Sequence, residues 1–138
     1  MPLTMKLNLI TPTKTVLQDE VEEVTLNTED GEITVLPKHS ALVSILRPGQ
    51  LVAKKDGKSM PLATAGGVVE MRANQLTILA DTAEPAEEID VERAEERAKE
   101  LARKLADETK LDITTYKTLQ RQFEKEQARI GVAKKWRK

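Results

Sequence analysis

The stretch GEITVLPKHSAL, residues Gly31–Leu42, contains in short form the pattern of the first part of the chain. Asp30-Gly31 favours a turn, Ile33–Leu36 is a short apolar run, and a proline follows it. Similar runs recur on both sides, about ten residues apart, which is the spacing of short strands in sandwiches and barrels. The expected strands are centred on Met5–Leu9, Val21–Leu26, Ile33–Leu36, Leu42–Leu46, Leu51–Ala53, Val68–Met71 and Leu76–Leu79.

Turn signals separate these runs. They are Thr11-Pro12-Thr13, Asp30-Gly31, Arg47-Pro48-Gly49, Asp56-Gly57, Gly66-Gly67 and Ala73-Asn74. Asp56-Gly57 is the best hairpin signal, because both residue types tolerate a positive φ. Gly66-Gly67 also fits a close approach of the backbone at the start of a strand. We therefore expect an all-β antiparallel sandwich, that is, a flattened barrel.

The composition changes near Pro85. All six prolines and five of the six glycines precede residue 87, and only Gly131 follows it. The later segment shows helical spacing of apolar residues over Asp90–Asp107 and Thr114–Lys135, with Thr109–Asp112 between them. Such a short connection predicts an antiparallel helical hairpin. We expect two domains: a β-sandwich at 1–86 and a two-helix domain at 87–138.

The expected faces of the two helices are narrow. The first helix has Val91, Ala94, Ala98, Leu101, Ala102 and Leu105 on one side, and the second has Tyr116, Leu119, Phe123 and Ile130. Two helices that bury so little apolar area are marginally stable by themselves. The hairpin therefore needs the sandwich, a ligand or another subunit to hold it, and such an element is suited to act as a conformational switch.

Composition also excludes several classes of protein. The chain has 138 residues, with 22 basic and 23 acidic residues, so bulk charge does not favour a nucleic-acid binder. It has no cysteine and a single histidine, His39, which excludes disulfides, cysteine zinc sites and multi-histidine metal sites. No nucleophile–base pair is visible, so we expect no enzyme and no metal. No apolar run is long enough for a membrane span, and no apolar leader is present.

Several strings resemble those of one family, the epsilon subunit of the rotary F-type ATP synthase. They are Gly31–Leu42, Arg47-Pro48-Gly49, Ala65–Met71 (AGGVVEM) and Leu76–Ala83 (LTILADTA). The resemblance runs from about Leu7 to Ala94. Two departures are Thr34, where the family commonly has glycine, and Ser40-Ala41, where it commonly has Ala-Pro.

This resemblance implies a non-catalytic subunit of the central stalk. The sandwich would bind the gamma subunit and the c-subunit ring, with Glu32 and His39 as candidates for contact with the c ring. The helices would fold against the sandwich or extend toward the alpha/beta catalytic head, where they block ATP hydrolysis. The subunit would be peripheral, without inserting into the membrane, on the cytoplasmic face of a bacterial plasma membrane or the stromal face of a thylakoid. The alternatives left open are a stand-alone β-sandwich protein-binding module with a helical adaptor and, for His39, an ordinary exposed loop histidine.

A second string, Ile89–Ala94 (IDVERA), resembles the "I/L-D-x-x-R-A" motif that binds ATP in some bacterial epsilon subunits. Asp90 at a helix start could accept hydrogen bonds from adenine or ribose, and Arg93 could meet a phosphate. The alternative is that Asp90 is only a helix cap. No cofactor is required, and ATP is a candidate regulatory ligand. The candidate ATP-binding residues are Glu84, Ile89, Asp90, Arg93, Ala94, Lys125 and Arg129, with Arg97 and Arg103 near an expected basic position.

The second helix and the tail are rich in basic residues. The family resemblance makes them candidates for contact with an acidic segment of the beta subunit in the extended state. These candidates are Arg121, Lys125, Arg129, Lys134 and Lys135. For the tail itself, the alternative is a solvated helix end that the helix dipole favours. The acidic cluster at Asp19, Glu20, Glu22 and Glu23 is interpreted as a solvated edge or loop.

Overall fold

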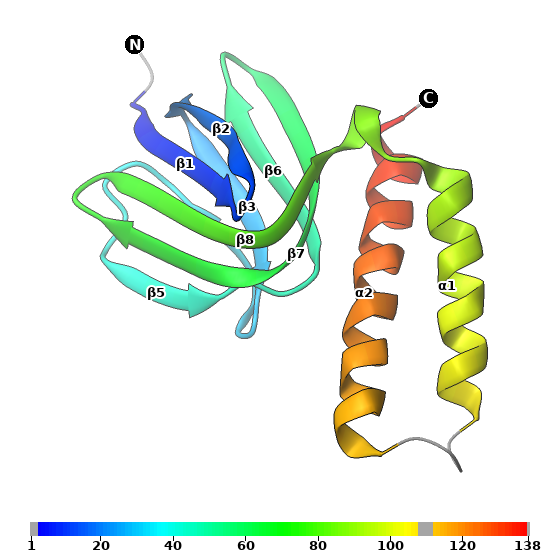
Figure 1. Cartoon of the computed structure of the whole chain (residues 1–138). Coiled ribbons are helices and arrows are strands. Elements are labelled where there is room, and N and C mark those ends of the chain that lie inside the picture. The colour runs from blue at the N-terminus through cyan, green and yellow to red at the C-terminus, as the bar shows by residue number, and fades with distance from the viewer. Residues whose placement is uncertain (1–2, 108–111, 138) are drawn as a thin grey trace.

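The computed structural model describes residues 3–107 and 112–137 and places a curved β-sheet beside a helical hairpin (Figure 1). The predicted sandwich followed by an antiparallel hairpin is confirmed. The strands are β1 (Met5–Thr11), β2 (Lys14–Val21), β3 (Glu23–Thr28), β4 (Gly31–Val35), β5 (Leu42–Ile45), β6 (Gly49–Lys55), β7 (Lys58–Arg72) and β8 (Gln75–Pro85). The helices are the short 3₁₀ turn η1 (Ala86–Glu88), α1 (Val91–Ala106) and α2 (Ile113–Trp136).

The strands form one sheet in the order β2-β1-β8-β7-β6-β3-β4, and β5 pairs with β7. Neighbouring strands are antiparallel except β1 and β8, which pair in parallel. This parallel pair differs from the antiparallel arrangement expected from the sequence. The first and the last strand of the sheet segment are thus neighbours inside the sheet, with β2 and β4 at its edges.

The core of the sandwich is aliphatic. On β1, Met5, Leu7 and Leu9 are fully buried and alternate with more exposed residues, as the period of two in the sequence predicts. Sixteen buried apolar residues form this core, and none of them is aromatic. Its members come from β1, β2, β3, β4, β6, β7 and β8 and from the residue after β5. The sheet therefore folds into two layers that enclose one core between them.

Two local turn predictions are confirmed. Asp56 and Gly57 have φ values of 53° and 75° and join β6 to β7 as a two-residue hairpin loop. Ala73 and Asn74 have φ values of 51° and 59° and join β7 to β8 in the same manner. Both pairs match the backbone that tight hairpins need, because positive φ at both central residues suits the twist of the strands.

The interpretation of Gly66-Gly67 as a turn between strands was wrong. Both residues lie inside β7, which begins already at Lys58, and both have positive φ. A Cβ atom on Gly67 would stand 2.1 Å from the carbonyl oxygen of Leu79, so the backbones of β7 and β8 approach closely here. The expected close approach is therefore present, but in the middle of a long strand and not at its start.

The segment before Val21 is also a strand that the sequence pattern did not predict. β2 lies at the edge of the sheet and carries part of the acidic cluster. Asp19 forms an ion pair of 2.8 Å with Lys55, and Glu23 forms one of 3.6 Å with Lys54. The hydrogen bond from Lys55 is the main cause that lowers the pKa of Asp19. The cluster is thus on an edge, as expected, but it is partly paired with the end of β6.

The helix bounds agree with the prediction within one residue. Asp90 caps α1 by accepting a 3.1 Å hydrogen bond from the amide of Arg93, and Asp112 caps α2 by accepting one of 2.7 Å from the amide of Thr115. On α1, Ala94 is among the buried residues, as expected. The predicted connection Thr109–Asp112 lies outside the described residues except for its last member.

The buried face of α2 differs from the one predicted. Its expected apolar residues, Tyr116, Leu119, Phe123 and Ile130, are only half-buried. The buried ones are Glu126, Val132 and Ala133. The reason is that α2 lies between α1 and the sheet (Figure 1), so two different sides of the helix are covered and no single stripe describes both.

Candidate functional site

The helical hairpin meets the sheet through a small apolar cluster, which we call the junction cluster. Its buried members are Ala63, Ala86, Ile89, Val132 and Ala133, with Val91 and Trp136 half-buried around them. Three of the five buried residues are alanines, so the apolar area removed from water is modest. The junction cluster is separate from the sandwich core and contains the C-terminal end of α2.

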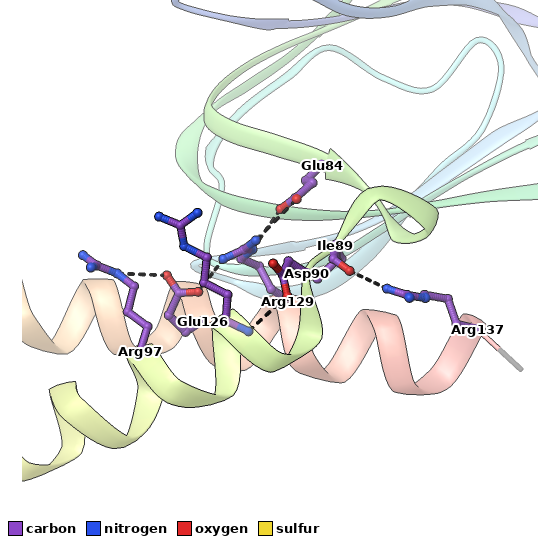
Figure 2. Close-up of polar contacts among 8 residues, drawn as sticks. Glu84, Ile89, Asp90, Arg97, Glu126, Arg129 and Arg137 are labelled. Carbon is purple, nitrogen blue, oxygen red and sulfur yellow. Dashed lines mark hydrogen bonds and ion pairs between the residues drawn. The ribbon is translucent and has the colours of Figure 1, made fainter.

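Two hydrogen bonds flank the junction cluster. Trp136 at the end of α2 donates from Nε1 to Oε1 of Gln50 on β6, over 2.6 Å. Arg137 donates from Nη1 to the carbonyl oxygen of Ile89, at the start of the hairpin (Figure 2). These bonds tie the last residues of the described chain to the sheet and to the segment just after β8.

Four charged side chains form a network beside the junction cluster (Figure 2). Arg129 on α2 donates from Nε to Oε2 of Glu84 on β8, over 2.8 Å, and from Nη1 to Oε1 of Glu126, over 2.7 Å. A longer contact of 3.4 Å joins Nη2 of Arg129 to Oε1 of Glu84. The other oxygen of Glu126 lies 3.5 Å from Nε of Arg97 on α1. The network therefore links the sheet and both helices.

Arg129 is the centre of this network. Partial burial opposes the charge of its guanidinium, but the hydrogen bonds that it donates to Glu84 and Glu126 outweigh that effect and raise the pKa of Arg129. Arg129 thus stays charged while α2 is docked. Glu84 and Arg129, two predicted site residues, are brought into direct contact, and Arg97 joins them through Glu126.

The structure places the motif Ile89–Ala94 at the start of α1. Ile89 is buried in the junction cluster, and Asp90 uses one carboxylate oxygen as the helix cap. Arg93 is exposed and, in the described part of the chain, its side chain forms no ion pair. Ala94 is fully buried, at 0% exposure, so its small side chain serves packing of the helices. The capping alternative for Asp90 is therefore present, beside its candidate role in binding.

Lys125 lies apart from this network. It lines a groove of about 830 Å³ between the first half of α2 and the sheet. Arg47, Lys117 and Arg121 line the same groove, together with Gly66 and Gly67 of β7. The structure therefore divides the predicted ATP-binding set: Glu84 and Arg129 are joined, whereas Lys125 faces a different part of the surface.

The remaining predicted contact residues are on the surface. Glu32 on β4 and His39 in the loop after β4 are both exposed. On α2, Arg121 is exposed, Lys134 pairs with Glu95 of α1 over 3.5 Å, and Lys135 lies over the ring of Trp136 at 5.5 Å. This places Lys134 and Lys135 at the last turn of α2, where cations are favoured.

The sequence analysis missed an exposed apolar row on the outside of the sheet. Ile45 pairs with Val68, and Val68 pairs with Leu79, so three strands carry adjacent apolar side chains. These residues are 51%, 44% and 53% exposed. Adjacent exposed apolar residues mark a surface for a partner more often than isolated ones do. The sequence signal was the doublets Val68-Val69 and Ile78-Leu79, in which both faces of a strand are apolar.

Comparisons with known proteins agree with this architecture. The family model of the ATP synthase delta/epsilon chain, β-sandwich domain, matches residues 4–86. The ATP synthase epsilon chain of Herpetosiphon aurantiacus is 45% identical over 92 residues, which are 67% of this chain and 68% of that one. For the epsilon chain of a Roseiflexus species, 46% identity covers 64% of each chain. The epsilon chain of Geotalea uraniireducens is 38% identical over 134 residues, covering 95% of this chain and 94% of its own.

Solved structures give the same result. A chain of the Euglena gracilis mitochondrial ATP synthase, in a structure of OSCP, F1 and the c-ring, has a TM-score of 0.79 and 26% identity, covering 93% of this chain and 80% of its own. A chain from the central stalk and c-ring of the Tetrahymena thermophila enzyme shares the fold, with a TM-score of 0.65 and 18% identity. In the described ranges, no helix is long and apolar enough to cross a bilayer. The sandwich, the hairpin and these likenesses together place the chain in the family of ATP synthase delta/epsilon chains, among the epsilon subunits.

Proposed function

We propose that this chain is a non-catalytic central-stalk subunit that couples the rotor of an F-type ATP synthase to its c ring and regulates ATP hydrolysis by releasing its helical hairpin. The observation that supports this most is the size of the junction cluster. Five buried residues join the hairpin to the sheet, whereas sixteen form the sandwich core. Docking is therefore much weaker than folding of the sandwich, as a reversible switch requires.

The sandwich is the proposed platform on the rotor. We assign the exposed apolar row at Ile45, Val68 and Leu79 to the gamma subunit. Burial of these side chains against a partner would remove apolar surface from water and so stabilise the complex. Glu32 and His39, which are exposed beside β4, remain the proposed contacts with the c ring. The subunit would then lie at the membrane surface, on the cytoplasmic side in bacteria or the stromal side in plastids.

The hairpin is the proposed regulatory part. In the docked state Arg129 is held by Glu84 and Glu126, and Lys134 is held by Glu95. Undocking from the sheet would break the contact of Arg129 with Glu84, and separation of the two helices would free Lys134 from Glu95. These cations, together with Arg121, Lys125 and Lys135, would then meet an acidic segment of the beta subunit in the alpha/beta head. The same side chains thus stabilise two states, and the partner determines which state prevails.

ATP is the proposed regulatory ligand of the docked hairpin. Its phosphates would bridge Arg93 of α1 to Arg129 of α2, with adenine and ribose near Ile89, Asp90 and Ala94. Lys125 lines the separate groove, so its side chain would have to turn from the groove to reach the same phosphates. A ligand that binds only the docked state stabilises it by RT ln(1 + [ATP]/Kd), about 2.7 kcal/mol at a hundredfold excess over Kd. Calorimetry of the isolated chain with ATP and Mg²⁺ tests this proposal: we expect binding heat that Arg93→Ala reduces, and an absence of heat at millimolar ATP would contradict it.

A reversible cross-link tests the regulatory proposal. The chain has no cysteine, so a Gln50→Cys, Trp136→Cys pair joined by a short reducible bis-thiol reagent would hold α2 against β6, where these side chains meet. Each single-cysteine variant treated with the same reagent is the matched control. We expect that the cross-linked subunit no longer inhibits ATP hydrolysis by a reconstituted catalytic head and that reduction restores inhibition. Equal inhibition with the cross-link intact would show that the hairpin does not need to move.

A further inference from the structure

Glu126 is unusual among the charged residues of this chain. It is 2% exposed, and within residues 3–107 and 112–137 it is the one charged side chain that is buried. A carboxylate is buried at a large cost in solvation unless cations and hydrogen bonds compensate for it. Both of its oxygens are compensated, because Oε1 accepts from Arg129 at 2.7 Å and Oε2 lies 3.5 Å from Nε of Arg97.

The two arginines come from different helices. Arg97 is on α1, Arg129 is on α2, and the carboxylate of Glu126 lies between their guanidinium groups (Figure 2). Two guanidinium groups that converge on one pair of oxygens form a site for an oxyanion, and a phosphate group would satisfy the same donors. In this chain a side chain of α2 itself fills the position.

Each of the three guanidinium nitrogens of Arg129 makes one hydrogen bond in this arrangement, which uses three of its five N–H donors. Nη1 binds Glu126, whereas Nε and Nη2 bind Glu84. A phosphate that binds Arg129 through the donors now used by Glu84 or Glu126 must therefore displace that carboxylate. Of these, Glu84 is the more exposed, and Glu126 is the one enclosed between the helices.

We propose that Glu126 acts as an internal substitute for a phosphate ligand: it fills an oxyanion site made by Arg97 and Arg129, joins α1 to α2 without nucleotide, and competes with any phosphate that enters. The proposal deepens the regulation proposed above and rests on the hairpin being the mobile part. Glu126 then determines how strongly this chain binds a phosphate-bearing ligand. A phosphate must first replace the carboxylate of Glu126, so the net free energy of phosphate binding is smaller than at an empty site.

The test removes the carboxylate and asks whether an anion takes its place. The full chain is titrated with pyrophosphate in a calorimeter as wild type, as Glu126→Ala and as Glu96→Ala. Glu96 is an exposed acid next to Arg97 on α1, so its substitution makes the same change in net charge close to the site while the carboxylate of Glu126 stays in place. We expect Glu126→Ala to bind pyrophosphate about tenfold or more tightly than Glu96→Ala, since one regained charge-assisted hydrogen bond is worth about that ratio. Equal affinity of the two variants would overturn the proposal.

A second pair of measurements locates the site. Adding Arg97→Gln to Glu126→Ala should return the affinity for pyrophosphate to that of Glu96→Ala, and retained tight binding would contradict the assignment of Arg97. Glu126→Ala could also release the hairpin, which hydrogen exchange would detect as faster exchange of the amides in α1 and α2. Pyrophosphate should then slow this exchange again. Exchange that stays fast with pyrophosphate would overturn the oxyanion site. Glu126→Ser, which also leaves the position between the two arginines open, takes the place of Glu126→Ala if the latter does not fold.

This outcome is independent of the cross-linking experiment. Pyrophosphate binding is measured on the isolated chain, without the catalytic head. A failure of the oxyanion site would leave hairpin release as the regulatory step, and a failure of regulation by the cross-linked subunit would leave the anion measurements unchanged.

Discussion

Truncation of Val132 to alanine isolates the strength of hairpin docking. Val132 is 3% exposed and belongs to the junction cluster, not to the sandwich core. The change removes two methyl carbons, worth about 0.8 kcal/mol each in transfer free energy, and the remaining cavity adds to that sum. We therefore expect docking to weaken by about 2 kcal/mol, which multiplies the population of the released hairpin by about 30.

Hydrogen exchange followed by mass spectrometry measures this population. Amides of α1 and α2 should exchange about 30-fold faster in Val132→Ala, because the released hairpin is only marginally helical. Amides of β1 and β8 should be unchanged. The matched control is Val24→Ala, which makes the same truncation at a fully buried position of the sandwich core and should accelerate exchange in the sheet. If Val132→Ala accelerated the sheet and the hairpin equally, the two would open as one unit and the reasoning would be refuted.

Three further predictions concern single positions. Gly67→Ala should lower the free energy of unfolding by about 2 kcal/mol or more, because its Cβ would stand 2.1 Å from the carbonyl oxygen of Leu79. Urea denaturation checks this, and an unchanged midpoint would show that the backbones of β7 and β8 can move apart here. The hydrogen bond from the amide of Thr115 lowers the pKa of Asp112 from its ordinary value of 3.8. The charged carboxylate of Asp112 therefore stabilises α2 at pH values above 3.8, and this stabilisation is lost as the pH falls through the lower pKa of the folded state. Asp112→Asn keeps a side chain that can cap the helix, so its helical circular-dichroism signal should fall less than that of wild type between pH 4 and pH 2. An equal fall would show that groups other than Asp112 cause the loss of helix in acid. Val68→Ser should change the unfolding free energy by less than about 0.5 kcal/mol, since this residue is 44% exposed, yet should weaken co-purification with the gamma subunit; unchanged co-purification would exclude the apolar row as the docking surface.

The parts of the fold that depend on neighbouring residues were predictable. Asp56-Gly57 adopts the positive φ values that its residue types favour, and Asp90 and Asp112 cap the two helices. In each case the group that satisfies the residue lies within a few positions along the chain. Local chemistry therefore contains the information that is needed.

Features with two equally good local explanations were not predictable. Gly66-Gly67 has the same sequence whether it ends a strand or bends one, and only the approach of Leu79 from β8 decides between these. Similarly, β2 carries Asp19 and Glu20, whose charges are typical of loops. On an edge strand such charges are tolerated, because one side of the strand faces solvent.

The candidate site was predicted in part. The family motif identified Glu84 and Arg129 separately, and the structure joins them in an ion pair. The burial of Glu126 was not predicted, because an acidic residue in a charged helix normally lies in solvent. One signal was available: Glu126 follows Phe123 by three residues, so it shares the helix face that the apolar residues indicate.

The balance between apolar and charged contacts at the junction explains why docking is suited to regulation. A large apolar junction would hold α2 permanently, since nothing in the released state would replace the buried area. The junction cluster is small, and much of the remaining contact comes from Arg129 and its two carboxylates. An ion pair can be exchanged for another of similar strength, because an acidic partner or a phosphate satisfies the same guanidinium. In the proposed mechanism, the hairpin would therefore leave the docked state at a cost that a single partner is able to offset.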